Sequence, residues 1–74
     1  MNTTTKRAMW RAVRAYVNRD ASAHQHEMDE LVNELTDAEW NTLLRWLSIA
    51  DAVLAAKEAK PLTIIRQRIA MELL

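Results

Sequence analysis

The chain contains no glycine and no cysteine, and this double absence limits it more than any motif does. A Walker-type phosphate loop, a dinucleotide-binding fingerprint and the strained turn of a nucleophile elbow all need a residue without a Cβ atom, so all three are excluded. Without cysteine there is no disulfide framework, thiolate zinc site, iron–sulfur cluster or cysteine nucleophile. We therefore expect a protein that is not an enzyme, that needs no cofactor or metal, and that works through its surface.

Length and periodicity define the fold class. The chain has 74 residues, of which 50% are hydrophobic and 27% are charged, as in one small globular domain. Its apolar residues recur at helical spacing from end to end. The sequence predicts an all-α fold, a single compact four-helix domain over residues 1–74, with helices at about 5–18, 22–35, 37–59 and 62–74.

Polar residues indicate where the first two helices begin. Thr4 or Thr5 is the expected cap of the first helix, because a threonine hydroxyl accepts a backbone N–H at that position. Ser22 followed by Gln25 has the spacing of a capping box, which predicts the start of the second helix.

The third helix has the clearest ends and an unusual surface. Thr36 and Glu39 have capping-box spacing, and Pro61 ends the helix because the residue before proline avoids the α region. At about 100° per residue, its large apolar side chains form two adjacent stripes over more than half of its circumference. We therefore expect this helix to lie at the centre of the domain. The first stripe consists of Trp40, Leu43, Leu44, Leu47 and Leu54, and the second of Trp46, Ile49 and Val53.

So much apolar surface exceeds what a short chain can cover. A domain of this size buries only about 60% of the surface of its unfolded chain, and exposed apolar patches of more than a few hundred Å² usually mark an interface. We predict a homodimer interface, or alternatively a site for a different protein, on the second stripe and the fourth helix. Its candidate residues are Trp46, Ile49, Val53, Ile64 and Met71.

The formal net charge is zero, but the charges are segregated. Residues 1–19 carry basic side chains and no acid, whereas residues 20–39 carry acids and no lysine or arginine. Lys6, Arg7, Arg11 and Arg14 form a candidate basic surface on the first helix. Three readings are open for this surface: a flank that is solvated or pairs with the acidic second helix, contact with nucleic-acid phosphates, and contact with an acidic protein.

The second helix carries the opposite charge. Glu27, Glu30 and Glu34 form a candidate acidic surface, which either engages a basic partner or is solvated and balanced by the first helix. His24 and His26 are two residues apart, so on a regular helix they point in nearly opposite directions and cannot bind one metal.

Asp51 falls inside the main apolar stripe of the third helix when the residues are projected down the helix axis. A buried carboxylate is costly unless it is paired or hydrogen-bonded. We expect a partner from an arginine of the first helix, from Arg66 or Arg68, or from a tryptophan indole N–H. The alternatives are that Asp51 reaches solvent, or that it receives an arginine from a partner protein.

One local resemblance exists. The segments Glu34–Glu39 and Ser48–Ala55 are similar to parts of the Hha family of small nucleoid-associated modulators, which are also short, four-helical and not enzymes. The similarity covers about a quarter of the chain and needs a gap inside a helix, and Ala52 and Val53 replace the histidine and arginine of that family. We therefore assign no family. The small size and lack of motifs are also similar to those of many phage-encoded inhibitors of host machinery.

These observations predict a small helical protein, of host or phage origin, that acts by protein–protein interaction as a regulator, adaptor or inhibitor. The alternative is a nucleic-acid-associated modulator that uses the basic surface of the first helix. No segment has the apolar h-region of a secretory signal or the length of a bilayer span, so we expect a cytoplasmic protein without membrane contact.

Overall fold

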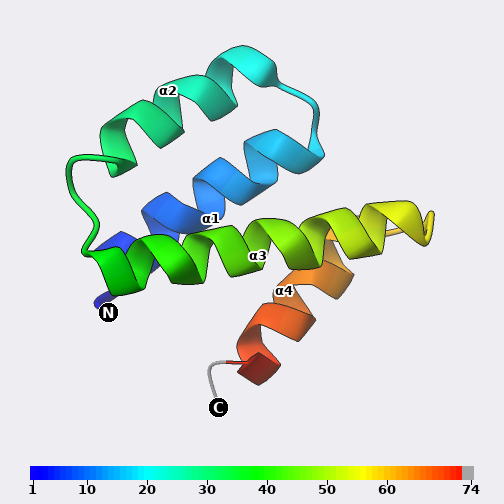
Figure 1. Cartoon of the computed structure of the whole chain (residues 1–74). Helices are drawn as coiled ribbons and strands as arrows, with labels where there is room; N and C mark the ends of the chain where they lie inside the picture. The colour runs from blue at the N-terminus through cyan, green and yellow to red at the C-terminus, as the bar shows by residue number, and fades with distance from the viewer. Residues whose placement is uncertain (73–74) are drawn as a thin grey trace.

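The computed structural model describes residues 1–72 (Figure 1). It confirms the predicted all-α domain of four helices. The predicted bounds are close to the observed ones at most ends, and residues 73–74 of the predicted fourth helix lie outside the described part. The helices are α1 (Thr3–Val17), α2 (Ala21–Leu31), α3 (Asp37–Ala55) and α4 (Pro61–Glu72).

The caps of α1 and α2 are not the predicted ones. The Oδ1 atom of Asn2 accepts the backbone N–H of Thr5 at 2.7 Å, and Oδ1 of Asp20 accepts the N–H of Ala23 at 3.1 Å. The predicted threonine caps and Ser22 therefore lie inside the helices. The reason is that asparagine and aspartate also cap strongly, and the charge of an aspartate suits the positive end of the helix dipole.

The predicted start of α3 is confirmed. The backbone N–H of Glu39 donates to the Thr36 hydroxyl at 3.1 Å, and the N–H of Thr36 donates to the Glu39 carboxylate at 3.0 Å, which completes the capping box. The bond from the Thr36 N–H lowers the pKa of the Glu39 carboxyl below its usual value. Pro61, the predicted breaker, is the first residue of α4, where its missing N–H costs nothing.

Two helices end in a left-handed residue although the chain has no glycine. Arg19 has φ 58° and Lys57 has φ 55°. At Arg19 the geometry is a Schellman motif, because the N–H of Asp20 donates to the Ala15 carbonyl and the N–H of Arg19 donates to the Tyr16 carbonyl. At Lys57, whose N–H donates to the Leu54 carbonyl, the left-handed residue ends α3 earlier than the predicted end at about residue 59.

The helix at the centre of the packing is α1, which corrects the prediction that the third helix is central. α1 lies next to all three other helices, whereas α2 lies next to α1 only and α3 lies next to α1 and α4 (Figure 1). The exposure of the side chains on α3 and α1 explains this difference. Leu44 of the first stripe on α3 is 44% exposed, so one side of α3 remains open, while α1 buries Met9, Ala12 and Val13 completely.

All four helices contribute to one hydrophobic core. α2 contributes a single buried side chain, Leu31, so the core is built mainly by α1, α3 and α4. The buried residues are Met9, Ala12, Val13, Val17, Leu31, Leu43, Trp46, Ala50, Val53, Ile65 and Ile69.

The core takes up part of the predicted interface. Trp46 is 3% exposed and Val53 is fully buried, so both side chains belong to the core and only the outer edge of Trp46 reaches the surface. Their placement in an exposed apolar patch is therefore corrected. Ile49 and Ile64 are partly buried against the core, and only Met71 is largely exposed. The physical reason is that the buried face of α3 lies where the two stripes meet, so it takes Leu43 from the first stripe and Trp46 and Val53 from the second.

Candidate binding groove between α1 and α4

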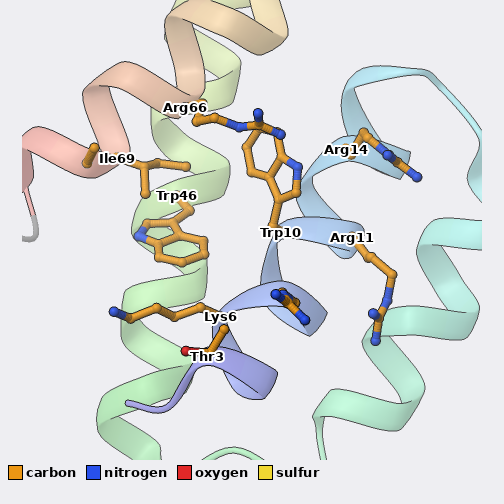
Figure 2. Close-up of a pocket in the computed structure, with 10 residues that line it drawn as sticks. Thr3, Lys6, Trp10, Arg11, Arg14, Trp46, Arg66 and Ile69 are labelled. Carbon is orange, nitrogen blue, oxygen red and sulfur yellow. The ribbon is translucent and has the colours of Figure 1, made fainter.

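A groove of about 510 Å³ lies along α1, beside α4 and over α3 (Figure 2). The three helices bring together residues that are far apart in the sequence. Its lining consists of Thr3, Lys6, Arg7, Trp10, Arg11 and Arg14 from α1, Trp46 from α3, and Arg66, Ile69 and Ala70 from α4.

The floor of the groove is apolar and aromatic. Trp46 and Ile69 are core residues whose outer edges line the groove, and Trp10 is partly buried beside them. The guanidinium carbon of Arg66 lies 4.9 Å from the centroid of the Trp10 ring, which is a cation–π contact (Figure 2). The Trp10 Nε1 atom is buried and has no hydrogen-bond acceptor among the described residues.

The rim of the groove is basic. The whole predicted basic surface, Lys6, Arg7, Arg11 and Arg14, lines the groove, and all four side chains are exposed. Arg66 joins them from α4, and no acidic side chain is among the lining residues. Sequence reasoning missed the contribution of Arg66 because helical periodicity does not show that α4 packs beside α1. We refer to these cations together as the basic rim.

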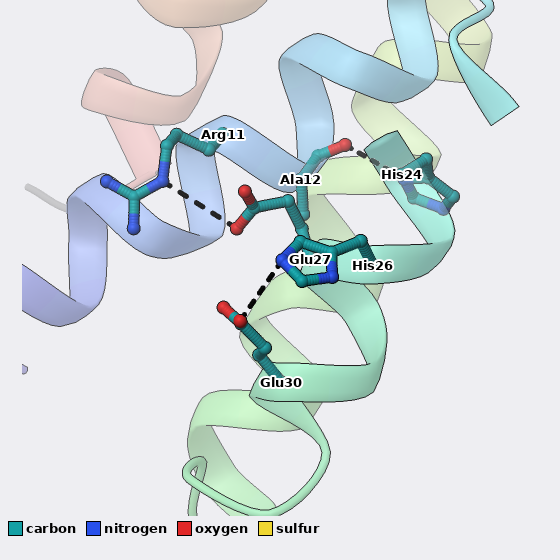
Figure 3. Close-up of polar contacts among 6 residues, drawn as sticks. All are labelled: Arg11, Ala12, His24, His26, Glu27 and Glu30. Carbon is teal, nitrogen blue, oxygen red and sulfur yellow. Dashed lines mark hydrogen bonds and ion pairs between the residues drawn. The ribbon is translucent and has the colours of Figure 1, made fainter. Parts of the chain in front are cut away.

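On its other side, α1 faces the acidic helix. The Nε atom of Arg11 lies 3.6 Å from a carboxylate oxygen of Glu27 (Figure 3). This is the only ion pair between α1 and α2 within residues 1–72. Pairing within the fold therefore accounts for Arg11, whereas Lys6, Arg7 and Arg14 have no carboxylate within 4 Å in that part of the chain.

The candidate acidic surface is not gathered into one site. Glu27 faces α1, and Glu30 lies 3.1 Å from Nε2 of His26 on the outer side of α2 (Figure 3). Glu34 lies beyond the end of α2, in the turn before α3, and is exposed.

The two histidines point to different groups, as their spacing predicts. His24 faces α1, where its Nδ1 lies 2.9 Å from the carbonyl oxygen of Ala12 (Figure 3). Because a carbonyl only accepts, Nδ1 carries the proton. The ring of His24 lies 5.2 Å from that of Tyr16 between centroids, so it packs between α1 and α2, whereas His26 is exposed.

Asp51 is exposed, and none of the expected basic or indole partners contacts it. Instead it accepts a hydrogen bond from the Tyr16 hydroxyl at 2.5 Å, which ties α3 to α1. That hydrogen bond, together with burial and the charge of the carboxylate, raises the pKa of Tyr16 above its usual value. Of the alternatives for Asp51, the structure therefore supports the one in which it reaches solvent, because the main stripe on α3 is wider than the face that is buried.

Comparison of the chain with protein-family models, with curated proteins and with solved structures gives no match. None of the helices in residues 1–72 combines the length and apolar composition that crossing a membrane requires.

Proposed function

We propose that the protein is a non-enzymatic binding module that acts by protein–protein contact as a regulator, adaptor or inhibitor. The partner binds in the groove between α1 and α4. The observation that carries this proposal is the basic rim on an apolar floor, with no acid in the lining. An apolar centre with a charged edge is the usual anatomy of a protein interface, and tryptophan and arginine are the side chains most enriched at binding hot spots.

The basic rim does little for the fold itself. Among its members only Arg11 has a carboxylate partner in the described residues. Lys6 and Arg7 lie near the N-terminus of α1, where no acid is present in the first turn and a positive charge opposes the helix dipole. A cluster of cations that weakens its own helix supports a role outside the monomer.

Affinity capture with matched charge variants tests the proposal. The groove variant is Arg7→Glu/Arg14→Glu, and the control is Lys60→Glu/Arg68→Glu, which changes the net charge equally at exposed positions outside the groove. We expect a protein captured from an extract of the source organism by the wild type and the control to be lost with the groove variant. Circular dichroism verifies that both variants remain helical. Equal capture by both variants would show that the groove is not the binding site.

A second candidate function is nucleic-acid binding, which the addition of Arg66 to the three arginines of α1 favours. The aromatic residues argue against it. Tyr16 is hydrogen-bonded to Asp51 outside the groove, so it is not placed to stack on bases there, and the ring of Trp10 is already in cation–π contact with Arg66. Binding to labelled DNA and RNA over a range of salt decides the question, because neutralised phosphates lower log K steeply with log salt.

Self-association remains a prediction, but the structure leaves less exposed apolar surface for a dimer interface than the sequence suggests. Trp46 and Val53 belong to the core, which leaves Ile49, Ile64 and Met71 for a dimer interface. Light scattering at micromolar concentration measures the mass directly, and the mass of a single chain would exclude the homodimer.

A further inference from the structure

We propose that the groove binds an amphipathic α-helix of the partner, about three turns long, whose apolar stripe is flanked on both sides by carboxylates. The inference rests on the proposed function, and it specifies the shape and chemistry of the segment that binds. Three properties of the groove support it: its length, its apolar floor and its charge. A fourth observation is that, within residues 1–72, this chain has no helix of its own that matches both the floor and the charge.

The length of the groove follows from α1. The residues of α1 that line it run from Thr3 to Arg14. At about 1.5 Å per residue this is about 16 Å, which matches about three turns of a second helix laid alongside. A segment of that length presents apolar side chains at i, i+4 and i+7 to one surface.

The apolar floor favours a helix over an extended segment. Trp10, Trp46 and Ile69 provide carbon surface, and the groove walls are helices whose backbone groups bond within α1 and α4. An extended segment placed there would bury N–H and C=O groups with no backbone partner, and each such group is costly. A helix satisfies these groups internally and presents only side chains to the floor.

The charges select carboxylates. Arg7 and Arg14, seven residues apart along α1, have no carboxylate partner among the described residues, so their spacing matches acids at i and i+7 on a partner helix. Arg11 lies between them and is already paired with Glu27. Arg66 supplies a cation from α4, which calls for a carboxylate on the second flank of the partner's stripe. With no acid in the lining, an acidic helix meets complementary charge along the whole groove.

A second copy of this chain is a poorer occupant than a foreign helix. Its acidic helix is α2, but Leu31 of α2 is buried and Met28 packs against the core. The exposed side of α2 therefore carries carboxylates without an apolar stripe, and Val32, 58% exposed, lies past its end. Such a helix matches the basic rim but not the floor.

The test uses a synthetic helical peptide and the indole N–H signals of the protein in ¹H–¹⁵N NMR. The peptide, about 14 residues, carries Leu at i, i+4 and i+7 with Glu on both flanks. Trp10 and Trp46 line the groove, whereas Trp40 does not and is an internal control. We expect the peptide to shift the signals of Trp10 and Trp46 and to leave that of Trp40 unchanged. We also expect Arg7→Glu/Arg14→Glu to raise Kd about tenfold or more, and Lys60→Glu/Arg68→Glu to leave it unchanged.

Three further peptides complete the design. One has the same composition in shuffled order, one carries Lys in place of Glu, and one has a central Pro that prevents a continuous helix. All three should bind at least about tenfold more weakly if the stripe, the charge and the helix are each required. Equal binding of the shuffled or the Pro peptide would overturn the helical occupant.

Other outcomes overturn the inference in distinguishable ways. If the helical peptide does not bind while the groove variant still loses its captured protein, the groove function stands and the helical occupant is wrong. If the signals of Trp10 and Trp46 shift on dilution of the protein alone, the occupant is a second copy. If an oligonucleotide shifts these signals with a steep salt dependence and the peptide does not, the groove binds nucleic acid and the proposed function fails with the inference.

Discussion

On the side of α1 that faces α2, polar groups find partners inside the molecule. Arg11 meets Glu27, and Nδ1 of His24 meets the Ala12 carbonyl. Along the groove, the cations Arg7 and Arg14 have no acidic partner in the described residues and border an apolar floor. One helix thus presents the same kind of charge to two different environments.

This difference separates charges that belong to the fold from charges that are free for a partner. An exposed ion pair such as Arg11–Glu27 contributes at most about 1 kcal/mol and is weakened by salt. Cations on the groove side contribute no such pair, so changing them should affect binding and spare stability. The two sides can therefore be distinguished by mutation.

The largest effect on stability is expected at the groove floor, where the proposed binding surface coincides with the core. Trp46→Ala should lower the free energy of unfolding by about 3–5 kcal/mol, because a nearly fully buried tryptophan leaves a cavity. This is comparable with the whole stability of a domain of this size. Met71→Ala, at a side chain 72% exposed, should change it by less than about 0.5 kcal/mol. Urea denaturation measures both, and an equally small loss for Trp46→Ala would contradict the burial of its side chain.

The second-largest effect is a gain in stability, expected at the turn that connects α1 to α2. Arg19→Gly should raise the free energy of unfolding by about 1 kcal/mol, because a residue with a Cβ atom is strained in the left-handed region. Arg68→Gly, inside α4, should lower it by about 1 kcal/mol. Denaturant titration of the two variants shows directly whether each substitution raises or lowers the free energy of unfolding. If both variants were destabilised, Arg19 would not be in the left-handed conformation.

The third prediction compares the two sides of α1 directly. Arg11→Glu should lower the free energy of unfolding by about 0.2–1 kcal/mol, and the loss should shrink in about 1 M salt. The swap Arg11→Glu/Glu27→Arg should restore most of it. Arg7→Glu, on the groove side and near the N-terminus of α1, should cause no loss, because a carboxylate there suits the helix dipole. Thermal melts at low and high salt measure these effects, and a larger loss for Arg7→Glu than for Arg11→Glu would reverse the comparison.

The smallest effect concerns pH. Tyr16 is the only tyrosine, and its pKa is raised in the folded state by the hydrogen bond to Asp51. A raised pKa means that the neutral hydroxyl stabilises the fold below the unfolded-state pKa of about 10, and that this contribution is lost as the pH rises through the folded-state pKa. Above about pH 10, we expect the melting temperature of the wild type to fall more steeply with pH than the melting temperature of the Tyr16→Phe variant. Parallel pH profiles of the two proteins would show that the hydrogen bond does not contribute to stability.

Local signals in the sequence predicted much of the fold. The capping box at Thr36 and Glu39 and the break at Pro61 follow from side chains within a few residues of each other, and both are confirmed. The early end of α3 was not predictable in this way, because Lys57 adopts the left-handed conformation without a glycine to signal it.

The candidate site was predictable only in part, for a physical reason. The basic surface of α1 follows from periodicity within one helix, and the structure places all of its members at the groove. The contact of Arg66 with Trp10 depends on how α4 packs against α1, which periodicity does not determine. The same limit applies to α3, where Leu44 and Trp46 are both apolar and only the packing shows which of them is buried.

The attachment of α2 to α1 alone has a consequence for how the molecule opens. A helix that contributes one buried side chain, Leu31, is the segment whose local unfolding exposes the least core, so its amides should exchange with solvent before those of α1 and α3. Each such opening also separates Glu27 from Arg11 and adds an unpaired guanidinium to the groove rim. In the binding mode proposed for the groove, release of α2 and binding of an acidic partner would therefore be thermodynamically coupled, and each would make the other more favourable.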